Sequence, residues 1–216
     1  MTGKKRVAAW VGGVVATLIL LAVGITYVVV GVQGRDEVQS TIAREQIVGT
    51  PDMTPAAITA EAKKSGLDVA TLDIPSCSVA GQKIDTGAEA KCFASYMRIH
   101  ALESTGGQVY AEMGRYLDKN GKPTSDEALA AKDPKTGRPV ENAARNLWVT
   151  ETALATGLNM SWFAEQVSLF AIVVGVSLII IGIGLGVLTV FAFGLMPWRQ
   201  EKTAAAPTGG APAAAA

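Results

Sequence analysis

The chain has 216 residues, 49 % of them hydrophobic, and its 19 Lys and Arg balance 19 Asp and Glu to give a formal net charge of zero. It contains one histidine and two cysteines, so one subunit cannot supply a two-histidine iron site or a three-histidine zinc site. No basic stripe with interleaved aromatic residues is present, and we therefore predict no nucleic-acid partner.

The first element is an uncharged apolar segment, Val7–Val32, which follows Lys4, Lys5 and Arg6. It exceeds the roughly 20 residues that a helix needs to cross a membrane, and we predict a transmembrane helix. A buried helix of a soluble protein is the alternative. A signal peptide also begins with basic residues, but its apolar region is usually only about 7–15 residues long, and no Ala-x-Ala cleavage site follows here. An uncleaved anchor is favoured.

The central segment, residues 33–166, has the length of one small domain. We expect the first helix to continue through residues 35–38 and the chain to become extended over residues 42–48. Thr54-Pro55 is typical of a helix cap followed by the first helical residue, and Ser65-Gly66 predicts the end of that helix.

A second helix in this segment is predicted from its capping box, Thr86-Gly87-Ala88-Glu89, and from the stop signal Gly106-Gly107. Cys92 lies in its first turns, and Cys77 lies in the irregular stretch before it. In an oxidising compartment the two would form a disulfide, which stabilises a loop of this length by about 3 kcal/mol. Two unpaired thiols are the alternative. We predict no metal site at these cysteines, because neither has a Cys or His two to four residues away.

Turn signals fill residues 118–140, with a short helix predicted at Ser125–Ala131. We interpret this segment as an exposed, mobile loop, with a partner-binding loop as the alternative. From Glu141 onward the pattern is helical and leads directly into the second apolar segment. Trp148 and Trp162 would then belong to an aromatic belt at the membrane interface.

The second uncharged apolar segment is Val167–Trp198, and it predicts a second transmembrane helix. Five of the 19 basic residues but only one of the 19 acidic residues, Glu201, lie at the two ends of the chain, which leaves 14 basic and 18 acidic residues in the centre. The positive-inside rule therefore places residues 1–6 and 199–216 in the cytoplasm and the central domain outside. The Ala- and Pro-rich tail, 199–216, is predicted to be disordered.

Small residues in both spans predict close helix packing: Gly12 and Ala16 in the first, and Gly182 and Gly186 in the second. The two spans could pack together, or the second span could form a homodimer face. Neither span contains an ionisable residue, so an ion pathway or proton relay is not indicated.

Catalytic and cofactor-binding residues are not predicted. The sequence contains no Gly-x-Ser-x-Gly, Cys-x-x-Cys or phosphate-binding glycine motif. His100 has Glu103 one turn away, and a structural, hydrogen-bonded histidine is expected.

Three runs, Ile99–Met113, Trp148–Leu154 and Ala164–Phe170, resemble a family of two-span actinobacterial membrane proteins. The resemblance extends from the first span to the end of the second. Many members of that family carry the automatic label "aromatic ring-opening dioxygenase", which implies ring cleavage at non-haem iron. Because the chain has a single histidine, we transfer topology from this resemblance and no chemistry.

The resemblance also implies a shared motif at one helix end, which is a candidate partner or ligand surface. Its residues are His100, Gly106, Gly107, Tyr110 and Glu112.

We therefore predict an all-α protein of a bacterial cytoplasmic membrane, with two transmembrane helices flanking a small, mainly helical extracytoplasmic domain. The predicted role is a non-enzymatic accessory or scaffold subunit whose partners are the lipid bilayer and a membrane protein or a second copy of the chain. An extracytoplasmic sensor is the first alternative and a membrane-tethered enzyme the second.

Overall fold

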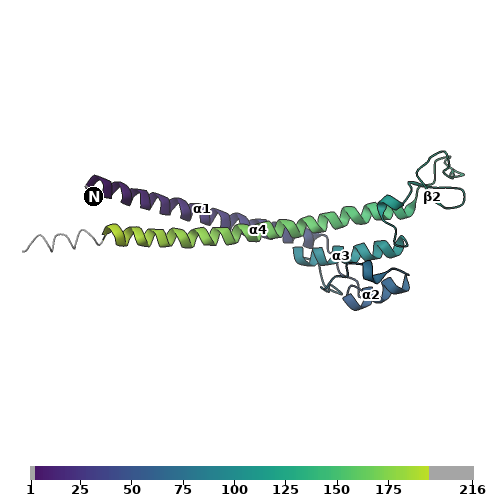
Figure 1. Cartoon of the computed structure of the whole chain (residues 1–216), viewed down its shortest axis with the longest axis horizontal. Helices are drawn as coiled ribbons and strands as arrows, with labels where there is room; N and C mark the ends of the chain where they lie inside the picture. Colours follow the sequence, from purple (N-terminus) through teal and green to yellow (C-terminus); the bar gives the residue numbers. More distant parts are fainter. Residues whose placement is uncertain (1–2, 195–216) are drawn as a thin grey trace, which may run out of the picture. The chain divides into compact units, whose positions relative to one another are not determined.

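The computed structural model describes residues 3–194, which are mainly helical. Four α-helices and two short 3-10 helices follow one another, and a two-stranded hairpin precedes the last helix (Figure 1). Their bounds are α1 Gly3–Arg44, α2 Pro55–Lys64, η1 Val69–Thr71, α3 Gly87–Ser104, η2 Tyr110–Glu112, β1 Tyr116–Leu117, β2 Pro123–Thr124 and α4 Ala143–Gly194.

Two compact units share this chain, and α1 and α4 each contribute to both. The end unit contains the described residues up to Val32 and from Leu169 onward, and the central unit is Gln33–Ser168. Trp198 and the tail predicted to be disordered lie outside the described residues.

In the end unit, α1 and α4 pack antiparallel through small residues. A Cβ atom on Gly24 would lie 2.8 Å from the Gly175 carbonyl oxygen, and one on Gly175 would lie 2.6 Å from the Gly24 carbonyl oxygen. Side chains at these positions would therefore force the two backbones apart. Further along the same pair of helices, Gly186 faces Thr17.

The glycines predicted in the second span, Gly182 and Gly186, both face α1, with Leu20 lying beside Gly182. In the first span the prediction for Gly12 is wrong by one residue. A Cβ atom added to Gly12 would have no other atom within 4 Å. A Cβ atom added to Gly13 would lie 2.6 Å from the Thr189 hydroxyl oxygen. A helix turns about 100° per residue, so a one-residue error points a position away from the contact.

Both helices of the end unit are long and apolar enough to cross a membrane. In their most apolar windows only 6 % and 11 % of the residues are buried, which differs from the core helix of a soluble protein. Large apolar side chains such as Leu18, Ile180 and Leu188 are 60–67 % exposed.

The central unit has a core made by α2, α3, the loops between them and one face each of α1 and α4. Figure 1 shows α2 beside α3. The residues at its centre are fully or almost fully buried: Ile42, Ile58, Ala62, Val79, Ile84, Ala90, Tyr96, Ile99 and Leu158.

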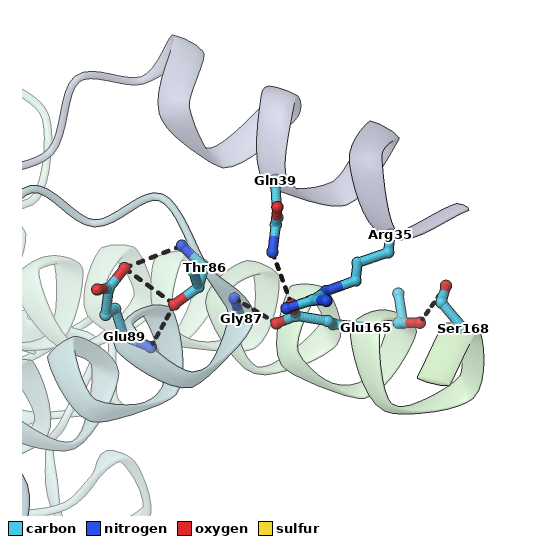
Figure 2. Close-up of polar contacts among 8 residues, drawn as sticks. Arg35, Gln39, Thr86, Gly87, Glu89, Glu165 and Ser168 are labelled. Atoms are coloured by element: carbon cyan, nitrogen blue, oxygen red, sulfur yellow. Dashed lines mark hydrogen bonds and ion pairs between the residues drawn. The ribbon is translucent and has the colours of Figure 1, made fainter. Parts of the chain in front are cut away.

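Both helix starts predicted from caps are confirmed. Thr54 accepts a hydrogen bond from the Ala57 amide at 3.2 Å, and Thr86 and Glu89 form the reciprocal capping box (Figure 2). At the other end of α3, Gly106 and Gly107 adopt φ values of +65° and +81°, which favour glycine and end the helix.

Cys77 and Cys92 form the expected disulfide, with their Cα atoms 6.2 Å apart. The hydroxyl of the buried Tyr96 donates a 2.6 Å hydrogen bond to the Cys77 carbonyl oxygen. The loop before α3 is therefore attached to that helix at two neighbouring points.

Two local predictions are wrong. Helix α1 continues to Arg44, because Ile42 packs into the core from the helix, and only Val48 and Gly49 are extended. Residues 125–131 do not form a helix, because the Ala131 amide donates to the Leu117 carbonyl oxygen of the hairpin at 2.8 Å.

Candidate functional site

His100 lies on α3 between two carboxylates. Its Nε2 is 3.0 Å from Asp52 Oδ2, and its Nδ1 is 3.0 Å from Glu103 Oε2. Both ring nitrogens can donate only when the ring is protonated. Because each nitrogen faces a carboxylate, neither is placed to take a proton from a nearby hydroxyl or thiol.

Asp52, Glu61 and His100 have one ligand atom each within 4.8 Å of one another. An imidazole nitrogen with carboxylate oxygens is a ligand set that a divalent cation such as Zn²⁺ can use. The hydrogen bond from Thr50 is the largest influence on the pKa of Asp52, and it helps to hold that pKa below its ordinary value. The sequence suggested no metal site here, because Asp52 and Glu61 are far from His100 along the chain.

The rest of the predicted motif serves local structure. Glu112 accepts a 2.9 Å hydrogen bond from the Val109 amide at the start of η2. Tyr110 is 46 % exposed, and the guanidinium of Arg145 lies 4.4 Å from the centre of its ring and donates to its hydroxyl.

His100 and Tyr110 do not belong to one surface. The groove beside His100 is lined on α4 by Leu147, Glu151 and Leu154, whereas the surface beside Tyr110 contains Val149, Ala153 and Thr156. At 100° per residue these two sets lie on opposite faces of α4. The motif therefore does not form the single ligand surface that was predicted from it.

The groove between α3 and α4 has a volume of about 400 Å³. Its lining is mostly apolar with a few polar groups: Met97, His100, Ala101, Ser104, Leu147, Thr150, Glu151 and Leu154. Concave, mainly apolar surfaces with a few polar groups are typical of small-molecule sites.

Glu151 is the least expected residue of this groove. Its side chain is only 6 % exposed, and its Oε2 lies 3.6 Å from Arg98 Nη1. Its Oε1 is buried and has no hydrogen-bond partner. A buried carboxylate oxygen without a donor is costly, so the charge of Glu151 is balanced only in part by Arg98.

Trp148 lies beneath Arg98, whose guanidinium is 3.9 Å from the centre of the indole ring. The indole is 4 % exposed, so the interpretation of Trp148 as part of an aromatic belt is wrong. Trp162 is partly covered by Lys91 in the same way, at 3.7 Å. These contacts fix α3 against α4 on one side of the groove.

A second buried carboxylate, Glu165, ties three elements together (Figure 2). It accepts hydrogen bonds from Arg35 Nε at 3.0 Å, Gln39 Nε2 at 2.9 Å and the Gly87 amide at 2.8 Å. Burial acts to raise the pKa of Glu165, but the hydrogen bonds from Arg35, Gln39 and Gly87 outweigh it and lower this pKa. This role could not be predicted from the sequence, since Glu165 is one of 18 acidic residues in the central segment.

Comparison with known proteins found no matching family model, no matching curated protein and no matching solved structure. The resemblance to the actinobacterial two-span proteins therefore stays a prediction, and the site is interpreted from its own geometry.

Proposed function

We propose that this chain is a non-enzymatic membrane anchor that presents its central unit, as an extracytoplasmic domain, to a protein partner. The observation that carries the proposal is the bare apolar surface of the end unit. Lipid is the environment in which two such helices, with their largest apolar side chains exposed, are stable.

The orientation is supported by charge and by helix direction. Antiparallel packing of α1 against α4 supports an arrangement in which Gly3 and Gly194 face the same side of a membrane. Lys4, Lys5 and Arg6 favour the cytoplasm as that side under the positive-inside rule. The disulfide between Cys77 and Cys92 agrees with an oxidising compartment for the central unit. A bacterial cytoplasmic membrane follows from the resemblance to actinobacterial proteins.

The contacts of His100 favour a binding role over catalysis. The only histidine has a carboxylate at each ring nitrogen, so it is engaged in structural contacts rather than positioned as a general base. The dioxygenase label of the resembling family would require iron ligands that a single histidine cannot supply.

Affinity purification from native membranes tests the proposal. The tagged full chain, extracted in a mild detergent, should retain a stoichiometric protein partner or a second copy of itself. Recovery of the chain alone and as a monomer would contradict a presenting role.

A second candidate function is suggested by the unpaired Oε1 of Glu151. A small ammonium compound with an apolar body would bind in the α3–α4 groove and pair with the Glu151 carboxylate. Hexylammonium should then raise the melting temperature of the protein, hexanoate should not, and Glu151→Gln should remove the effect. An equal response of the variant would exclude this site.

A further inference from the structure

The part of α4 within the central unit carries an exposed stripe of five apolar residues and one threonine. Alternating steps of four and three residues separate its members: Val149, Ala153, Thr156, Met160, Phe163 and Val167. All six are exposed, and Met160 and Phe163 are 56 % and 54 % exposed. In the sequence the same spacing continues through Phe170, Val174, Ser177 and Ile181, of which Ser177 alone is polar.

This stripe lies opposite the face of α4 that packs inside the central unit. The packed face carries Trp148, Leu158 and both acidic residues of the segment, Glu151 and Glu165. Between residues 147 and 170 no other charged residue occurs. The outward surface is therefore uncharged, whereas a helix face in water is normally polar and charged.

The spacing indicates which kind of partner covers the stripe. Steps of four and three average 3.5 residues, the repeat that keeps apolar side chains against a neighbouring helix along its whole length. A partner with a flat or globular surface would not require this repeat.

A second copy of the chain fits best. Two copies anchored in the same orientation bring identical α4 helices together in parallel, so that each stripe faces itself in register. The residues flanking the stripe, Thr152, Asn159 and Gln166, are uncharged, so like copies do not repel.

We propose that the chain is a parallel homodimer joined along this stripe of α4. The inference rests on the proposed membrane anchoring, which gives both copies one orientation. It also moves the dimer face away from Gly182 and Gly186, which contact α1 of the same chain.

Cysteine cross-linking in native membranes tests the dimer. The described residues contain no free cysteine, so one introduced thiol is the only reactive one there. Ala153→Cys and Thr156→Cys, both nearly volume-conserving, should give an oxidised product of twice the chain mass. The matched variants Leu154→Cys and Ser161→Cys, on the same helix but off the stripe, should stay at the monomer mass.

Absence of the doubled product at both stripe positions, or equal yields at all four positions, would overturn the homodimer. A product of another mass would assign the stripe to a different protein. Each variant should still sediment with membranes and require detergent for extraction. That control separates failure of the dimer from failure of the proposed anchoring.

Discussion

At the scale of single residues, two buried carboxylates distinguish the central unit. Glu165 has three hydrogen-bond donors, whereas one oxygen of Glu151 has none. The first is a structural tie between α1, α3 and α4, and the second is a candidate for ligand contact. Neither role could be predicted from sequence, because both depend on residues far away along the chain.

Replacing Glu165 by Gln should destabilise the central unit by about 1–3 kcal/mol, because one of its two acceptor oxygens becomes an NH2 group that faces another donor. The matched variant Glu37→Gln, which removes the same charge from an exposed position on α1, should change stability little. Denaturant unfolding in mild detergent, followed by tryptophan fluorescence, measures both.

The stability difference between the wild type and Glu165→Gln should depend on pH, because the pKa of Glu165 is lowered in the folded state. A carboxyl whose pKa is lower in the folded state stabilises the fold fully above its ordinary value of 4.5 and loses that contribution as the pH falls through the folded-state pKa. The stability gap between the wild type and Glu165→Gln should therefore narrow below pH 4.5. A gap that is constant down to acid unfolding would contradict the assigned role.

At the scale of elements, the helix pair of the end unit depends on close backbone approach. Gly175→Val should destabilise this pair by about 1–3 kcal/mol, since the new side chain meets the Gly24 carbonyl and Val28. Gly12→Val adds the same atoms where nothing lies within 4 Å and should be nearly neutral. Thermal unfolding of α1 and α4 in detergent, measured by circular dichroism, compares the two, and equal losses would refute the packing.

The sequence predicted helix starts and ends correctly where they depend on interactions between residues close together in the chain. Thr54 and Thr86 cap helices by accepting from amides three residues away, and Gly106 ends α3 through its own backbone conformation. These features are encoded within a few residues, so the sequence alone was sufficient.

Long-range contacts account for the errors. The helical end of α1 is held by core packing at Ile42. Ala130 and Ala131 pair with Asp118 and Leu117, so residues 125–131 do not form a helix. Trp148 is covered by Arg98 of α3 rather than exposed at an interface. Helical periodicity located the packing glycines of the second span, but the first span needed the neighbouring helix to distinguish Gly12 from Gly13.

At the scale of the whole molecule, the two units have opposite surface requirements. The end unit exposes apolar side chains on both of its helices, and the central unit has its own core and a disulfide. A membrane would suit the exposed apolar side chains of the end unit. An oxidising aqueous compartment would suit the disulfide of the central unit. Under the proposed function the central unit is the part presented to a partner, and the α3–α4 groove and the exposed stripe of α4 are its two distinctive surfaces.

Thiol labelling of protoplasts tests the central claim, that the chain is anchored with its middle outside. Asn120→Cys places one free thiol at the exposed turn of the hairpin, and Thr203→Cys places one in the C-terminal tail. A membrane-impermeant maleimide should label Asn120→Cys in intact protoplasts and Thr203→Cys only after permeabilisation. Labelling of Asn120→Cys only after permeabilisation, or of Thr203→Cys before it, would contradict the account.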